Sequence, residues 1–128
     1  MVLTLDPTEF HSGHRSLSIA FDGAGINDAG FYQLIPVEPN RDYEFGAFFK
    51  NDEFQGAGGP VLAIRDFYSN ESFFVSEELK DSDVWKPVRT TFVTGPETRL
   101  LIVRVERIPP GNAIRGRLWL DDFDLSPR

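Results

Sequence analysis

Two adjacent carboxylates, Asp121 and Asp122, lie inside an apolar run near the end of the chain, residues 116–125. Aspartate is depleted from strand interiors, and the burial of an unpaired carboxylate costs several kcal/mol. The pair therefore needs an exposed edge, a hydrogen-bonding partner or a bound cation. This position indicates a site, although it does not by itself indicate a reaction.

The sequence does not favour an enzyme. Glycosidases use two carboxyl groups about 5 to 9.5 Å apart, whereas neighbours on a strand point to opposite faces unless a bulge intervenes. The two histidines, His11 and His14, lie in a turn-like segment beside Ser12 and Ser16, with no evident acid or oxyanion donor for a catalytic triad. They also lack the helix and the glutamate of a zinc-hydrolase motif.

The composition predicts one folded domain that spans residues 1–128. A hydrophobic content of 41% with 26% charged residues excludes a disordered chain. The formal charge of −7 argues against nucleic-acid binding, because phosphate groups need a basic surface. No apolar run approaches the roughly 20 residues of a membrane helix, so we expect no membrane insertion. No export signal is recognisable, and we expect any such signal to lie outside this chain.

Alternating apolar residues predict strands along the whole chain. In residues 43–50 the alternation places Tyr43, Phe45 and Phe49 on one face and Phe48 on the other. Further strands are expected at residues 15–21, 31–37, 61–68, 73–75, 85–93, 99–107 and 116–125, with one possible helical turn at 76–83. Seven or eight strands separated by Gly and Pro turns predict an all-β, antiparallel two-sheet β-sandwich of jelly-roll or immunoglobulin type.

Several short motifs follow one another in a characteristic order. They are residues 11–17, Tyr32 with Gln33, residues 37–43, Trp85 with Phe92, and residues 118–125. This order resembles that of the carbohydrate-binding modules of families four, nine and twenty-two, which are galactose-binding-domain-like jelly rolls. Two features depart from the family pattern: Asn40 replaces the usual glycine of a turn, and the opening strand of the family is not recognisable before Val2.

The resemblance implies a non-catalytic jelly roll that binds a polysaccharide or oligosaccharide on one sheet face. Such a module is accessory to neighbouring domains of a longer bacterial protein, which is extracellular, periplasmic or on the cell surface. It often holds a structural calcium, whose oxygen ligands here would come from Asp121 or Asp122, from Glu9 and from the backbone near Gly13. One alternative stays open, in which Asp122 hydrogen-bonds loop amides or pairs with Arg15.

A glycan face needs aromatic rings for stacking and polar side chains for the sugar hydroxyls. Phe48 is the best candidate ring, because it points away from the apolar side of its strand. We expect the ligand-binding residues to be Phe48, Arg65, Phe67, Arg89, Glu44 and Lys50. If Arg65, Arg89 and Arg104 share the face of Phe48, an acidic glycan is favoured. If they are scattered, a structural spacer or protein-interaction sandwich without sugar affinity is favoured.

Overall fold

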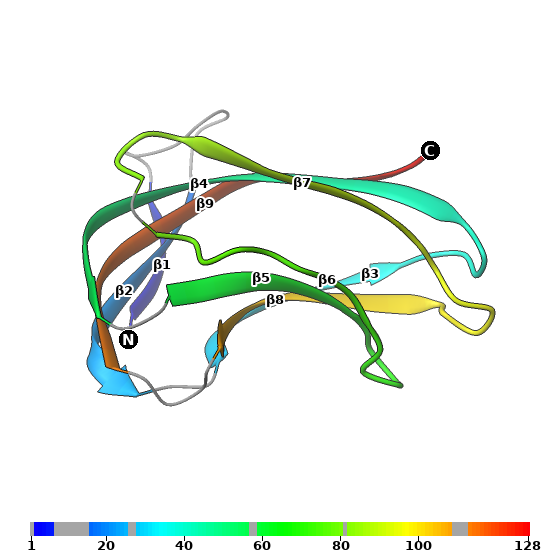
Figure 1. The fold of residues 1–128 in the computed structure, drawn as a ribbon, viewed down its shortest axis with the longest axis horizontal. Helices are drawn as coiled ribbons and strands as arrows, with labels where there is room; N and C mark the ends of the chain where they lie inside the picture. The colour runs from blue at the N-terminus through cyan, green and yellow to red at the C-terminus, as the bar shows by residue number, and fades with distance from the viewer. Residues whose placement is uncertain (1, 7–15, 26–27, 57–58, 81, 109–112) are drawn as a thin grey trace.

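The computed structural model describes residues 2–6, 16–25, 28–56, 59–80, 82–108 and 113–128, which form two stacked antiparallel β-sheets (Figure 1). The strands are β1 (Val2–Asp6), β2 (Ser16–Gly25), β3 (Asp28–Pro36), β4 (Asp42–Gly56), β5 (Gly59–Asp66), β6 (Ser72–Val75), β7 (Lys86–Val93), β8 (Leu100–Ile108) and β9 (Ala113–Pro127). The described part of the chain contains no helix, and hence none that could cross a membrane.

The five-stranded sheet has the order β1-β2-β9-β4-β7, and the four-stranded sheet has the order β3-β8-β5-β6. Except at the β5–β6 hairpin, strands that follow one another from β2 to β9 alternate between the two sheets, as the chain crosses from layer to layer (Figure 1). The expected all-β, two-sheet jelly-roll sandwich is therefore confirmed.

The core lies between the sheets and follows the alternation of each strand. On β4 the side chains of Tyr43, Phe45 and Phe49 are buried, whereas Phe48 is half-buried on the opposite side. The other sheet contributes Leu62 and Ile64 from β5 and Leu101, Val103 and Val105 from β8. Each buried side chain of this size contributes about 1.5 to 3 kcal/mol. The inner face of each sheet is thus set by residues two apart in the sequence.

An extra residue in β9 keeps two apolar stretches of that strand in phase. Gly46 of β4 pairs with Asp124 and Phe48 pairs with Asp121, so three residue steps on β9 match two on β4. Because of this bulge, the pair Leu118 and Leu120 and the pair Phe123 and Leu125 all pack on the core. A regular strand would turn one of the two pairs outward.

The bulge accounts for the two adjacent carboxylates that the sequence places in this strand. Asp122 has a φ of 56°, a left-handed conformation that aspartate tolerates better than most residues. Its backbone N–H donates a hydrogen bond to Oδ1 of Asp121 at 2.8 Å. The carboxylate of Asp121 therefore provides a hydrogen-bond acceptor for the backbone amide of Asp122, close to the point where the pairing of β9 with β4 shifts.

Two features differ from the expectations. The short strand β1 pairs with β2 at the edge of the five-stranded sheet and was not predicted from its five residues. The helical turn expected at 76–83 is wrong for the described residues, which carry no helix there. Instead, the N–H groups of Ser76 and Leu79 donate to the carbonyls of Leu62 and Pro60 on β5. The chain therefore continues along β5 after β6 ends.

The conformation of Asp122 predicts a difference between two substitutions that both remove its carboxylate. Asp122→Ala should lower the free energy of unfolding by about 1 kcal/mol more than Asp122→Gly, because alanine is strained at positive φ and glycine is not. Urea denaturation of the two variants measures this difference. Equal stability of the two variants would show that the backbone at this position is not left-handed.

Candidate functional site

The outer face of the four-stranded sheet combines exposed apolar side chains with a fixed polar centre. Its members alternate with the core residues of β5 and β8, and the strand register places Tyr32 of β3 beside Arg104 of β8 and Leu34 beside Ile102. We call it the four-stranded face. Its described side chains are Tyr32, Leu34, Pro36, Val61, Ala63, Arg65, Phe67, Val75, Leu100, Ile102, Arg104 and Glu106. The face is not exposed throughout, because Val61 and Ala63 of β5 are buried, at 4% and 0% exposure.

Exposed apolar side chains gather on this sheet. Among the described residues, seven large hydrophobic side chains are exposed, and five of them belong to β3, to β6 or to the turn between β5 and β6. These five are Tyr32 at 61%, Leu34 at 40%, Phe67 at 44%, Tyr68 at 78% and Val75 at 39% relative exposure. They lie on the two edge strands of the sheet and on the turn at its end. Exposed apolar side chains of this size are candidates for contact with a ligand or a partner.

Three charged side chains form the polar centre of the face. Arg65 donates from Nε and Nη2 to the two carboxylate oxygens of Glu106, at 3.2 and 3.0 Å. Arg104 donates from Nε to Oε2 of the same carboxylate at 2.6 Å. All three side chains are less than one third exposed. One carboxylate therefore holds two guanidinium groups in defined orientations.

The electrostatics of this centre favour the ionised carboxylate. Partial burial raises the pKa of Glu106, but the hydrogen bonds from Arg65 and Arg104 outweigh it, so the net pKa is lowered. The hydrogen bond to Glu106 raises the pKa of Arg65. Both shifts have the direction expected for a stable ion pair at neutral pH.

Two exposed aromatic rings stand at the end of this sheet, on the turn that follows β5. The rings of Phe67 and Tyr68 meet edge to face, with centroids 5.2 Å apart. Oδ1 of Asp66 accepts hydrogen bonds from the N–H groups of Tyr68 and Ser69, at 2.8 and 3.0 Å. These bonds end β5 at Asp66, before the Tyr68 boundary expected from the sequence, because the carboxylate folds the chain into a turn.

The six residues expected to bind a ligand do not share one face. Arg65 and Phe67 belong to the four-stranded face, whereas Glu44, Phe48 and Lys50 lie on β4 of the other sheet. Arg89 is on β7 and pairs in register with Gly46 of β4, so it shares the outer face of Phe48. A single flat site cannot include all six. Arg65 and Arg104 lie on a different sheet from Phe48 and Arg89, so the three arginines do not share the face of Phe48. This arrangement does not favour an acidic glycan on that face and favours the spacer or protein-interaction sandwich there. The outward face of Phe48 stays a separate prediction.

Other side chains cover the largest ring on the outer face of the five-stranded sheet. Trp119 points outward, because its neighbours Leu118 and Leu120 point into the core, yet it is only 5% exposed. The Nζ of Lys50 is 5.7 Å and the guanidinium carbon of Arg117 is 5.8 Å from its ring centroid. Cations lie over this ring, where a sugar would have to stack.

The structure supplies only part of the expected calcium site. Glu9 and Gly13 lie outside the described residues. Asp121 and Asp122 carry oxygens of the type that calcium prefers, but Oδ1 of Asp121 already accepts a hydrogen bond from the N–H of Asp122. No group of three metal-ligating side chains occurs in the described part of the chain. Calcium binding therefore stays a prediction.

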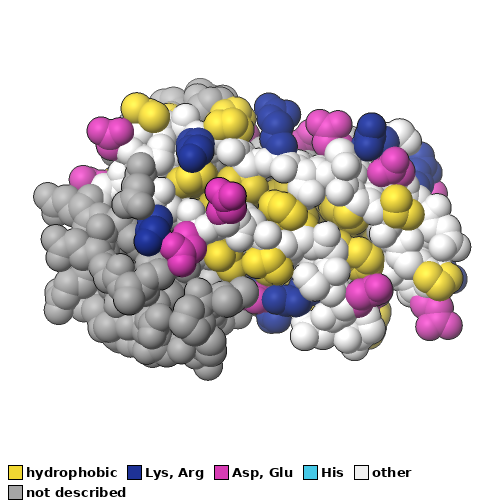
Figure 2. All heavy atoms as spheres, in the orientation of Figure 1, with side chains coloured by type: hydrophobic (Ala, Val, Ile, Leu, Met, Phe, Trp, Pro, Cys, Tyr) yellow, Lys and Arg dark blue, Asp and Glu magenta, His cyan; other side chains and the backbone are white. Residues whose placement is uncertain are grey.

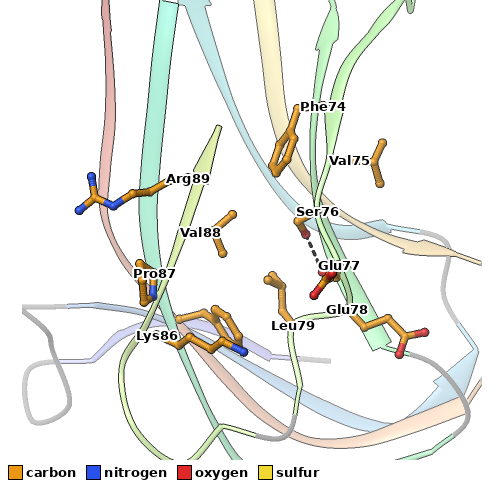
Figure 3. A pocket seen from close by; sticks show the side chains of 11 residues that line it. Phe74, Val75, Ser76, Glu77, Glu78, Leu79, Lys86, Pro87, Val88 and Arg89 are labelled. Carbon is orange, nitrogen blue, oxygen red and sulfur yellow. Dashed lines mark hydrogen bonds between the residues drawn. The ribbon is translucent and has the colours of Figure 1, made fainter. Parts of the chain in front are cut away.

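A pocket of about 290 Å³ opens between the edge strands β6 and β7 (Figure 3). Seen from this side, hydrophobic side chains form a band between the two sheets, with charged side chains around it (Figure 2). Leu79 and Val88 point into the pocket, while Arg89 extends away from it (Figure 3). Its apolar lining includes the core ring of Phe49, which is 4% exposed. The pocket is thus the open edge of the core rather than a platform for a ligand ring.

Solved structures of carbohydrate-binding modules have a similar fold. No family model and no curated protein matches the sequence. A solved family 4 carbohydrate-binding module is 14% identical, with a TM-score of 0.70, over 98% of this chain and 78% of that one. A family 16 module is 14% identical, with a TM-score of 0.68, over 97% and 84% of the two chains. The CBM22-1 xylan-binding domain from Paenibacillus barcinonensis Xyn10C is 13% identical, with a TM-score of 0.61, over 98% and 80%.

Some similar structures are larger than this chain. The CBM22-1–GH10 modules of Clostridium thermocellum xylanase 10B, solved with xylohexaose, match with a TM-score of 0.68 and 15% identity. This chain covers 98% of its own length there but 24% of that chain. At such low identities the likeness concerns the fold, and at that level it confirms the resemblance to carbohydrate-binding modules seen in the order of the motifs.

The hydrogen bonds that Asp66 accepts in the turn after β5 predict a loss of stability in acid. Asp66→Ala should lower the free energy of unfolding by about 1 to 3 kcal/mol, because two backbone amides lose their acceptor. Asp66→Asn should lower it less, because Oδ1 remains. The hydrogen bonds from Ser69 and Tyr68 outweigh partial burial and lower the pKa of Asp66. A carboxylate with a lowered folded-state pKa stabilises the fold above its unfolded pKa, near 3.8, and this contribution disappears as the pH falls through the folded-state value.

Urea denaturation at several pH values measures this effect. The advantage of wild type over Asp66→Asn should be present at neutral pH and should shrink in acid below about pH 4. An advantage that is unchanged in acid would show that the charge of Asp66 does not stabilise the turn.

The calcium prediction is tested by thermal unfolding in millimolar calcium and in chelator. A ligand that binds only the folded state raises Tm, so a calcium site at the end of the chain should raise the Tm of the wild type. Asp122→Asn, which keeps the size of the side chain, should remove that rise. A wild-type Tm that calcium does not change would leave Asp122 with the role of shaping the bulge.

Proposed function

We propose that this chain is a non-catalytic carbohydrate-binding module and that the glycan lies on the four-stranded face. The observation that carries the proposal is the exposed ring of Tyr32 in register with Arg104, which belongs to the centre formed with Arg65 and Glu106. Further exposed apolar side chains on the same face are Leu34, Phe67 and Val75. Apolar rings accept the C–H faces of sugars, and fixed polar groups satisfy their hydroxyls. The fold of known carbohydrate-binding modules supports the same function.

Tyr32 is the ring best placed to stack on a sugar. It is 61% exposed, and its register partner is Arg104, so a ring and a hydrogen-bond donor lie side by side on adjacent strands. Phe67 and Tyr68 extend the apolar surface at the end of the sheet. A sugar chain that follows the face could therefore contact rings at two places and the arginines between them.

The chemistry of the centre argues against glycoside hydrolysis at this face. A glycosidase acid needs a raised pKa so that it stays protonated, together with a second carboxyl group. The hydrogen bonds from its two arginine partners lower the pKa of Glu106 instead. Among the described side chains of the face, Glu106 is also the one carboxylate. The face is suited to binding rather than to proton transfer.

Similar structures that are parts of larger chains support an accessory role in a longer protein. One similar structure is that of the CBM22-1–GH10 modules, and another is the arabinose-bound MgGH51 α-L-arabinofuranosidase, of which this chain covers 22%. We infer that this chain likewise brings a parent protein to a polysaccharide outside the cell. The alternative is a spacer or protein-interaction sandwich, which would use the same exposed apolar side chains for a partner protein.

Paired substitutions on the two outer faces test the proposal. Affinity electrophoresis and calorimetry with β-glucans, xylans and uronic-acid polymers should detect binding by the wild type. Tyr32→Ala should weaken this binding about tenfold or more, the factor that a loss of roughly 1.4 kcal/mol of stacking produces. Phe48→Ala is the matched control, because it removes a ring from the opposite sheet.

The pattern of results separates the hypotheses. Loss with Phe48→Ala and not with Tyr32→Ala would move the site to the five-stranded sheet. A folded wild type that binds no glycan in the panel would refute the proposal and favour the spacer or interaction module. Thermal unfolding of each variant shows whether a loss of binding reflects a loss of folding.

A further inference from the structure

Among the described side chains, the polar centre of the four-stranded face carries more positive than negative charge. Its described charged side chains are Arg65, Arg104 and Glu106, and both oxygens of Glu106 accept hydrogen bonds from the arginines. The sum of the three charges is positive, on a chain whose formal net charge is −7. The centre therefore offers donors to a ligand, while its one carboxylate is already engaged.

Arg104 has donors to spare. It bonds Glu106 through Nε, and within the described part of the chain it makes no other hydrogen bond or ion pair. Its two terminal nitrogens thus have no partner among the described residues, and its side chain is 29% exposed. Arg65 differs, because Nε and Nη2 are both committed to Glu106 and its side chain is 17% exposed.

The edge formed by the two terminal nitrogens of a guanidinium matches the two oxygens of a carboxylate. Glu106 holds the Nε of Arg104, so little side-chain freedom has to be lost when this edge takes a ligand. Tyr32 stands beside it on β3 and is mostly exposed. A ring with a carboxylate substituent would meet both groups at once.

We propose that the four-stranded face is selective for acidic glycans and that Arg104 pairs with the carboxylate of a uronic-acid residue whose ring lies on Tyr32. The inference rests on the proposed function and names its substrate class. The net negative charge of the protein does not oppose it at short range, because charges farther than about 8 Å are largely screened at physiological salt.

Matched pairs of oligosaccharides test the selectivity, each pair differing in the carboxylate alone. One pair is hexagalacturonate and its methyl ester, and the other is a glucuronic-acid-substituted xylo-oligosaccharide and its carboxyl-reduced form. Calorimetry at physiological salt should show tighter binding of the acidic member in at least one pair. The expected ratio is about 10- to 100-fold, as for a hydrogen-bonded charge pair.

Variants of Arg104 locate the effect. Arg104→Gln should abolish the preference for the acidic member, and Arg104→Lys should restore part of it, because lysine keeps the charge but not the paired donors. Arg89→Gln is the control, since Arg89 lies on β7 of the opposite sheet. Thermal unfolding confirms that each variant is folded.

The outcomes distinguish the two levels of inference. Equal affinity for both members of both pairs would overturn the acidic selectivity and leave glycan binding intact. A preference that Arg89→Gln removes and Arg104→Gln keeps would overturn the assignment to this face. Binding of neither member, together with silence toward neutral glucans and xylans, would overturn the proposed function itself.

Discussion

The pairing of β4 with β9 is the constraint on which the rest of the sandwich depends. These strands lie inside the five-stranded sheet, and their inward side chains form one wall of the core. The wall is continuous because β9 takes one extra residue near Asp122, which returns Phe123 and Leu125 to the side of Leu118 and Leu120. With that wall complete, the four-stranded sheet can bury its inner face against the five-stranded sheet.

The two outer faces then differ in what they present. On the five-stranded sheet, Lys50 and Arg117 lie over Trp119, so a large aromatic surface is already in contact with protein cations. On the four-stranded sheet, Tyr32 is mostly exposed and the nearby arginines are turned to Glu106. A ligand would have to displace existing contacts on the first face, whereas on the second it would meet a ring and donors held in position.

The sequence predicts the faces of single strands better than it predicts their neighbours. The alternation in residues 43–50 places Phe45 inside and Phe48 outside, as the structure does, because the period of two is a local property of the strand. It does not indicate which sheet a strand joins, since pairing is a long-range matter. Arg65 and Arg89 therefore share an outward orientation but lie on different sheets. The bulge at Asp122 and the ion pair between Arg65 and Glu106 also depend on partners distant in sequence.

The cluster of Arg65, Arg104 and Glu106 could not be predicted from sequence motifs. Arg104 and Glu106 are two residues apart on one strand, and two charged residues at this spacing are typical of any solvent-exposed strand face. Their role emerges only when β5 brings Arg65 to the same carboxylate. Among the described side chains of this face, one carboxylate is shared by two guanidinium groups and cannot neutralise both, so one positive charge is left over. Because Arg104 is the more exposed of the two and bonds through Nε alone, that charge is presented chiefly at its terminal nitrogens, beside Tyr32.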